Sequence, residues 1–225
     1  MSPLGTPRLH HRLTDSTNER AKELARAGAP HGALVTAGEQ SAGRGRQDRA
    51  WKSAPGSALL MSLVLRDLDP LLPLAAAVAV SEAAEACAPV TCAVKWPNDV
   101  WVEGRKVAGI LVEGRPQEGW AVLGIGLNVR AQEFGPELRD VAITLELEAT
   151  EPVLKSLLGV LQRRLSDTPA AVLRAWRARD ALEGRTVHWK DGEGTAAGVD
   201  DSGALLVRTG DGEIALSAGE VHLRL

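Results

Sequence analysis

A polar loop with the composition of an anion-binding segment occupies residues 39–52. It reads EQSAGRGRQDRAWK and holds three arginines, one lysine and two glycines. Glycine lets backbone N–H groups approach a ligand closely, and guanidinium groups match the geometry of phosphate and carboxylate. The segment is neither a P-loop nor a dinucleotide-binding fingerprint, since Asp48 stands where a third glycine would be. The sequence therefore predicts an anion site here, with a solvated loop as the alternative.

A second group of chemically capable residues begins at KWPND (95–99) and ends at Lys106, which opens the apolar stretch 107–112. A lysine that enters a largely buried strand needs an anionic partner or water, because an unpaired buried ammonium is costly. Bound substrate is one candidate for that partner. The alternative is an edge position from which the ammonium reaches solvent. Asp99 follows Pro97-Asn98, a pair that suits the centre of a turn, so turn formation alone is one interpretation of this residue.

Small polar residues and glycines give weaker signals at two further places. Ser16 and Glu19 have the spacing of a capping box, so helix capping is the favoured role of Ser16. Gly124 and Gly126 fall within an apolar run, and paired glycines in a strand commonly mark a bulge or a close approach of the backbone. Asn128 follows them, and its amide suits hydrogen bonding to an adenine edge.

Apolar periodicity and turn residues predict the elements that position these groups. Helices are expected over 16–27, 69–86, 151–165 and 169–181, and strands over 32–39, 57–66, 90–96, 100–103, 106–113 and 120–128. The short connections between the later strands favour antiparallel pairing. The expected fold class is α+β, with a central mixed, mostly antiparallel sheet packed with helices.

The composition changes from about residue 182. Short β-like pieces follow, separated by the hairpin signals Asp191-Gly192, Ser202-Gly203 and Asp211-Gly212. We expect a small closed β-barrel here, and a division of the chain into domains 1–181 and 182–225.

Length and composition exclude several classes of protein. The chain has 225 residues, a net charge of −3 and 2 cysteines, too few for a disulfide framework or a tetrahedral zinc site. The longest apolar run, 71–80, is too short to cross a bilayer, and the N-terminus lacks the pattern of a secretory signal. We therefore expect a cytoplasmic protein with no membrane span, no metal ligands of its own and no general attraction to DNA.

Together, the identities, order and spacing of these motifs resemble the biotin protein ligases. The resemblance rests on STN (16–18), EQ (39–40), GRGR (43–46) with Trp51, KWPND (95–99), KVAGILVE (106–113) and GIGLNV (124–129). Residues 182–225 resemble the family's SH3-like C-terminal domain less specifically. Only fifteen residues precede Ser16, too few for the DNA-binding domain of repressor members, so the short form is implied. Gln47-Asp48 departs from the pattern, since many relatives have a glycine there.

The resemblance implies a ligase that works in two steps. Biotin and ATP would give biotinyl-5'-AMP and pyrophosphate, with Mg2+ arriving on the nucleotide. The biotinyl group would then pass to a lysine of the biotin carboxyl carrier domain of acetyl-CoA carboxylase or a related carboxylase. A homodimer formed through an exposed edge strand is compatible with the sequence.

The resemblance also assigns roles to individual residues. The biotin site would comprise Ser16, Thr17, Asn18, Gln40, Arg44, Gly45, Arg46, Lys106 and Gly109. The nucleotide site would comprise Arg44, Arg46, Arg49, Trp51, Lys106 and Asn128. The catalytic residues would be Lys106, Arg46 and Asp99. A carboxylate is ionised at neutral pH, so the first step needs charge neutralisation by cations, whereas the acceptor lysine must lose a proton, for which Asp99 is the candidate.

Two alternatives remain at this stage. A lipoate-protein ligase or octanoyl transferase shares the fold and the logic of acyl transfer, although the GRGR and KWPND segments argue against it. A non-catalytic biotin-binding module, such as a biotin-sensing repressor, belongs to another class. Release of pyrophosphate with biotin but not with lipoate separates all three.

Overall fold

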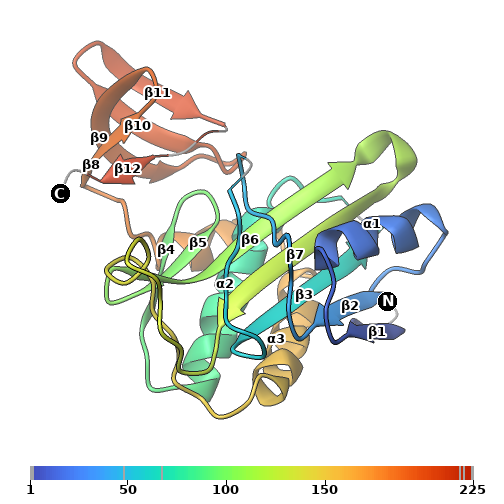
Figure 1. Ribbon diagram of the computed structural model, residues 1–225. Helices are drawn as coiled ribbons and strands as arrows, with labels where there is room; N and C mark the ends of the chain where they lie inside the picture. Colours follow the sequence, from blue (N-terminus) through green and yellow to red (C-terminus); the bar gives the residue numbers. More distant parts are fainter. Residues whose placement is uncertain (1–2, 48, 67, 218, 220, 224–225) are drawn as a thin grey trace.

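The computed structural model describes residues 3–47, 49–66, 68–217, 219 and 221–223, which form two sheets joined through helices (Figure 1). The larger sheet has the order β1-β2-β3-β7-β6-β5-β4. Its strands are β1 (Arg8–His11), β2 (Leu34–Ala37), β3 (Ala58–Leu65), β4 (Cys92–Lys95), β5 (Asp99–Val102), β6 (Arg105–Arg115) and β7 (Trp120–Asn128), with a 3-10 turn η1 (Pro116–Glu118) between the last two. Within the described part, no helix is long and apolar enough to span a membrane.

The pairing of the larger sheet confirms the predicted mixed, mostly antiparallel arrangement. β1 runs parallel to β2, and each of the other neighbouring pairs is antiparallel. Short turns connect β4 to β5 and β5 to β6, as expected for antiparallel neighbours.

Helices cover both faces of this sheet. On one face lies the long helix α2 (Leu72–Cys87), with α3 (Glu151–Arg164) and α4 (Pro169–Arg177) packed against α2. α2 is apolar almost all round, which suits a helix enclosed between a sheet and other helices. α1 (Thr17–Arg26) packs on the opposite face, against β2, β3 and β7.

Successive side chains of a strand point to opposite faces of the sheet, and this decides which residues of the central strands contact which helix. In β3, Leu59, Met61, Leu63 and Leu65 belong to the main core with α2, whereas Val64 packs into the smaller cluster beneath α1. The same alternation in β7 sends Leu123, Ile125 and Leu127 into the main core. The residues between them therefore face the α1 side, where α1 covers only part of the sheet.

The second sheet has the order β11-β10-β9-β8-β12 and is antiparallel throughout. Its strands are β8 (Thr186–Trp189), β9 (Gly192–Val199), β10 (Leu205–Thr209), β11 (Gly212–Leu216) and β12 (His222–Leu223). The expected closed barrel is wrong for the described residues. Within the described part of the chain, β12 (His222–Leu223) pairs with β8 and not with β11, so the sheet is open between β11 and β12 there.

One strand was not expected from the sequence. Residues 8–11 form the parallel edge strand β1, although their polar composition indicates a frayed end. Arg8 accounts for the difference, because its guanidinium pairs with Glu151 at 2.6 Å and donates to Thr36 Oγ1 at 3.2 Å. These contacts tie the strand to α3 and β2.

Hydrogen bonds among the described residues tie the second sheet and its loops to the rest of the chain. Trp96 Nε1 donates to the carbonyl of Gly203 at 3.0 Å, and Arg177 donates to the carbonyl of Val199 at 2.7 Å. Arg46 lies in the polar loop of residues 39–52, the Gly/Arg loop, and donates to the carbonyl of Gly219 at 3.2 Å.

Packing of α3 on α2 gives the first prediction. Leu157 is 0 % exposed, so Leu157→Ala leaves a cavity and should lower the free energy of unfolding by about 2–5 kcal/mol. Lys155→Ala, exposed on the same helix, should change it by less than about 0.5 kcal/mol. Urea unfolding measures both, and equal midpoints for the two variants would contradict this packing.

Candidate functional site

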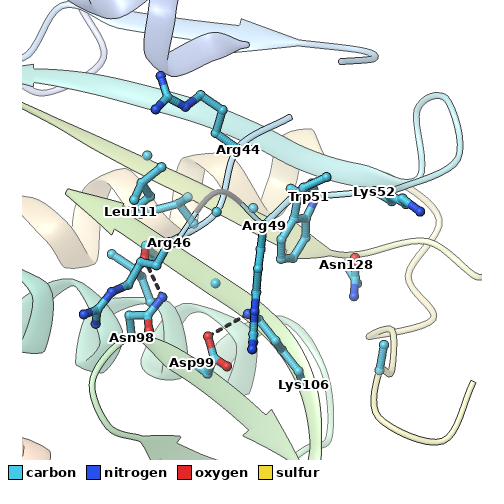
Figure 2. A pocket seen from close by; sticks show the side chains of 18 of the residues that line it. Arg44, Arg46, Arg49, Trp51, Lys52, Asn98, Asp99, Lys106, Leu111 and Asn128 are labelled. Carbon is cyan, nitrogen blue, oxygen red and sulfur yellow. Dashed lines mark hydrogen bonds and ion pairs between the residues drawn. The ribbon is translucent and has the colours of Figure 1, made fainter. Parts of the chain in front are cut away.

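A cavity of about 440 Å³ opens on the α1 side of the larger sheet (Figure 2). Its walls come from the start of α1, the Gly/Arg loop, the turn between β4 and β5, and strands β3, β6 and β7. Every residue to which sequence analysis gave a role lines it: Ser16, Thr17, Asn18, Gln40, Arg44, Gly45, Arg46, Arg49, Trp51, Asp99, Lys106, Gly109 and Asn128. The fold therefore brings these separated motifs together.

One end of the cavity is a buried polar network. Gln40 Oε1 accepts hydrogen bonds from the Thr17 backbone N–H at 2.7 Å and from its hydroxyl at 3.0 Å. Ser62 Oγ lies 2.8 Å from Thr17 Oγ1 and 2.6 Å from Asn18 Oδ1. Ser62 was missed by the sequence analysis. Its signal is a single serine in the apolar strand LLMSLVL, and a polar group buried there needs partners.

Ser16 does not form the expected capping box. It occupies the N-cap position of α1, yet its side chain makes no capping hydrogen bond. The Glu19 carboxylate is engaged elsewhere than in a capping box, because it pairs with Lys22 at 2.6 Å and with Arg44. The Ser16 side chain, 2 % exposed, lines the cavity instead.

Glycines on the α1 side of the sheet make room for side chains from elsewhere. A Cβ at Gly124 would lie 2.1 Å from Asn18 Oδ1, and one at Gly126 would lie 2.6 Å from the Trp51 ring. At Gly109 a Cβ would lie 3.1 Å from the Lys106 ammonium. Gly109 and Gly126 are cross-strand partners, so the floor beneath Trp51 and Lys106 is bare backbone. This is the close approach that the paired glycines indicated.

Lys106 finds its partner in Asp99. Its Nζ lies 2.6 Å from Asp99 Oδ1 and 5.8 Å from the centre of the Trp51 ring, a cation–π distance. Its side chain is 35 % exposed, so the ammonium is partly solvated at the cavity wall. An ammonium with a carboxylate and an aromatic face beside it can exchange the carboxylate for a phosphate or another anion.

The arginines of the loop point in different directions (Figure 2). Arg44 turns away from Lys106, toward Glu19 on α1 and Glu113 on β6. Arg46 reaches the second sheet through Gly219, and Arg49 extends toward Lys106. All three cations, Arg44, Arg46 and Lys106, line the cavity, but they do not converge on one point in this arrangement.

The loop itself is folded back as a narrow hairpin. The Gly45 N–H donates to the Arg49 carbonyl at 2.7 Å, and the Trp51 N–H donates to the Gly43 carbonyl at 2.9 Å. Gln47 has a φ of 51°, in the left-handed region that glycine adopts more readily. This is the physical consequence of its departure from the family pattern, while Asp48 lies outside the described residues.

Asn128 and the remaining walls complete the cavity. Asn128 is buried, and its amide donates to the Ile143 carbonyl at 3.1 Å, so its side chain is held by the segment after β7. Gly219 and His222 reach the cavity from the second sheet, which no local pattern indicated. Among the residues that the structure covers, no group of three or more His, Cys, Asp or Glu is placed to hold a metal ion.

Comparison of the sequence with known families gives two matches. The sequence model of the Biotin/lipoate A/B protein ligase family matches residues 10–129, and that of the Biotin protein ligase C terminal domain matches residues 182–224. The bifunctional ligase/repressor BirA of Bacillus subtilis is 36% identical over 98% of this chain and 75% of its own length. The biotin--[acetyl-CoA-carboxylase] ligase of Paracoccus denitrificans is 36% identical over 92% of this chain and 97% of its own.

A similar solved structure is the biotin protein ligase from Aquifex aeolicus in complex with biotin and ATP. It has a TM-score of 0.85 and 29% identity, and the match covers 97% of this chain and 99% of that one. The apo structure of the Aquifex protein gives a TM-score of 0.81 at 27% identity.

Adding a side chain at Gly124 tests whether the glycines make room for other side chains. Gly124→Ala should displace Asn18 and lower the free energy of unfolding by about 1–3 kcal/mol, because the new Cβ cannot coexist with the Asn18 amide. Gly114→Ala is the matched control on β6, where a Cβ would meet its neighbours at 3.5 Å or more. Urea unfolding and the NMR signal of the Asn18 side-chain amide measure the effect. An unmoved Asn18 signal in Gly124→Ala would contradict the assignment.

Titration of Glu19 gives a pH prediction. Burial opposes ionisation of Glu19, but hydrogen bonds and charge attraction from Lys22 and Arg44 outweigh it and lower the pKa of Glu19 below its ordinary 4.5. A carboxyl with a lowered folded pKa contributes stability that is complete above 4.5 and is lost as the pH falls through the folded value. The free energies of unfolding of the wild type and of Glu19→Gln, measured by urea unfolding, should therefore converge as the pH is lowered. A difference between the two free energies of unfolding that stays constant from about pH 6 to about pH 3 would contradict this.

Proposed function

Since the chain belongs to the biotin protein ligase family, we propose that it activates biotin with ATP as biotinyl-5'-AMP and transfers the biotinyl group to a lysine of a carrier protein. The observation that supports this most directly is that residues from every motif of the family line one and the same cavity. It contains a buried polar end for an uncharged head group and a cationic end for phosphates.

We propose that the head group of biotin lies at the buried end. A cyclic urea offers one carbonyl acceptor and two N–H donors, and Ser16, Thr17, Asn18 and Gln40 supply both kinds of partner. Arg44 belongs with this end, because its guanidinium contacts Glu113, which also accepts a hydrogen bond from the Asn18 amide at 2.8 Å. The carboxylate arm of biotin would then extend past Gly45, Arg46 and Gly109 toward Lys106.

In the first step, a carboxylate oxygen of biotin attacks the α-phosphorus of ATP and pyrophosphate leaves. Both reactants are anionic, so the residues must neutralise charge and hold the groups in line. Lys106, Arg46 and Arg49 are the cations we assign to this task, Arg44 contributing from the biotin side. Trp51 forms an apolar wall beside the adenylate, and Asn128 supplies an amide to the nucleotide.

In the second step, the amine of the acceptor lysine attacks the biotinyl carbonyl, forms the amide and releases AMP. The ammonium of that lysine must first lose a proton. We assign Asp99 to accept or orient it. Its ion pair with Lys106 supports a shared role, because a phosphate that attracts Lys106 leaves the Asp99 carboxylate available to the incoming ammonium.

Mg2+ would arrive with the nucleotide. Asp99 is the single carboxylate that the described residues place on the cavity wall, and Mg2+ prefers several oxygen ligands. The protein alone thus offers too few oxygens, and phosphate oxygens and water would complete the coordination. Bound there, the ion supplies further neutralisation of phosphate charge.

We also propose the acceptor, the domains and the location. The biotin carboxyl carrier domain of acetyl-CoA carboxylase or a related carboxylase is the acceptor favoured by the names of the relatives. Residues 1–181 would form the catalytic domain and 182–225 the C-terminal domain, supported by two separate sheets. Two free cysteines, Cys87 and Cys92, favour a reducing cytoplasm.

A homodimer would pair two copies through β1. This strand ends the larger sheet, and Leu9 and the neighbouring Leu13 are 45% and 47% exposed. An edge strand offers unpaired backbone groups to a second chain. Light scattering measures the mass in solution, and a monomer at all concentrations would contradict this pairing.

The decisive experiment combines the chain with biotin, ATP, Mg2+ and a carrier domain. Intact mass measurement should show one biotinyl group on one carrier lysine, together with release of pyrophosphate. Lipoate in place of biotin should give neither product. A lipoate ligase would give the reverse, and a binding module would bind biotin without releasing pyrophosphate.

Removing the Lys106 ammonium tests its catalytic role. Lys106→Met keeps the length of the side chain, and formation of biotinyl-5'-AMP should slow by about 10²–10³-fold, because one cation no longer stabilises the charge of the transition state. Lys190→Met, at an exposed turn, is the control and should act at the wild-type rate. Pyrophosphate release measures both variants. Equal rates for Lys106→Met and wild type would remove the assignment.

A further inference from the structure

Four charged side chains behind the biotin end form a closed ring of alternating sign. Lys22 Nζ lies 2.6 Å from Glu19 Oε1 and 3.2 Å from Glu113 Oε1. Arg44 pairs with the same two carboxylates, with Glu19 through Nη1 and with Glu113 through Nη2 at 3.5 Å. Each cation therefore contacts both anions, and the formal charges of the ring sum to zero.

The ring connects three elements of the site. Glu19 and Lys22 belong to α1, Arg44 to the Gly/Arg loop and Glu113 to β6. Lys22 is the most enclosed member, with its side chain 13% exposed, whereas that of Arg44 is 43% exposed. An enclosed ammonium is costly without anionic partners, so this arrangement differs from isolated pairs on a solvated surface.

Glu113 connects the ring to Asn18, which lines the cavity. Its Oε2 accepts a hydrogen bond from Asn18 Nδ2 at 2.8 Å, while Oε1 faces Lys22 and Arg44. A carboxylate can only accept, so it fixes which end of the Asn18 amide faces it. The other end, Oδ1, lies 2.6 Å from Ser62 Oγ above the bare backbone of Gly124. The orientation of Asn18 thus depends on a carboxylate whose charge Lys22 balances.

Lys22 has no place on the cavity wall, and neither do Glu19 and Glu113. Its influence on a ligand must therefore be exerted through the residues it holds. Without it, Glu19 and Glu113 would face each other across a single guanidinium, and repulsion between them would move Arg44 or Glu113.

We propose that Lys22 is a positioning residue for biotin binding, which sets Asn18 through Glu113 and the base of the Gly/Arg loop through Glu19 and Arg44. This inference rests on the proposed function and concerns how the biotin end is held in shape before the ligand enters. Pre-organisation of this kind raises affinity by reducing the ordering that binding requires.

Lys22→Met is the principal test, because methionine keeps the apolar stem and removes the charge. The Kd of biotin, measured by calorimetry without ATP, should rise about tenfold, the scale of a lost hydrogen bond to a charged group. The KM for biotin in pyrophosphate release should rise with it, while kcat stays within about twofold because Lys106 and its partner Asp99 take no part in the ring. Lys22→Arg should restore wild-type affinity.

Salt and a remote lysine supply the controls. Raising the salt to about 0.5 M should weaken biotin binding by wild type more than by Lys22→Met, which has already lost the ring. Lys155→Met, an exposed lysine on α3, should bind biotin with the wild-type Kd. Thermal melting monitors folding, and if Lys22→Met is unfolded, Glu19→Gln takes its place with a severalfold rise in Kd expected from the same loss of balance.

The outcomes separate the two proposals. An unchanged biotin Kd in a folded Lys22→Met, a fall in kcat with KM unmoved, or failure of Lys22→Arg to restore affinity would overturn the positioning role. Wild-type chain that binds no biotin would instead overturn the proposed function.

Discussion

The site depends on how the central strands divide their two faces. One face of β3, β6 and β7 carries leucines, isoleucines and a methionine of the main core, and the other face is nearly bare at Gly109, Gly124 and Gly126. Side chains from α1 and from the Gly/Arg loop occupy part of the space that the glycines leave open above the sheet. The cavity therefore depends on the lack of side chains at these glycines. Because residues alternate along a strand, a shift of one residue in register would place the glycines in the core and leucines in the site. The hydrophobic core therefore fixes the geometry of the cavity.

Charge balance is the second feature of the site. Lys106 pairs with Asp99, and Arg44 lies between Glu19 and Glu113. A ligand with phosphate and carboxylate groups must compete with these partners. The two cations differ in how strongly they are held, since Lys106 has one carboxylate at 2.6 Å and Arg44 has two. This difference supports a phosphate-facing role for Lys106 and a structural contribution from Arg44 at the biotin end.

Local patterns were sufficient to predict the motifs and most of the elements. The paired glycines indicated a bulge or a close approach of the backbone. Lys106 at the start of an apolar strand indicated an anionic partner or water, because an unpaired buried ammonium is costly. The ring of charges could not be predicted, because Lys22 and Glu113 are 91 residues apart and meet only through the packing of α1 against β7, which pairs with β6. Ser62 needed knowledge of which face its strand presents. The closed barrel was wrong for a related reason, since hairpin signals specify neighbouring strands and say nothing about whether the first and last strands meet.

Arg46 and Arg44 illustrate why two similar residues in one loop need not act alike. Arg46 donates to a neutral carbonyl, that of Gly219, whereas Arg44 binds two carboxylates. A phosphate that attracted Arg44 would have to displace Glu19 and Glu113 from it, so the exchange would bring little net gain. We therefore expect Arg44 to keep its two carboxylate partners when the nucleotide binds. The hydrogen bond from Arg46 to the Gly219 carbonyl is a different kind of contact, because it ties the Gly/Arg loop to the C-terminal domain and not to α1 and β6.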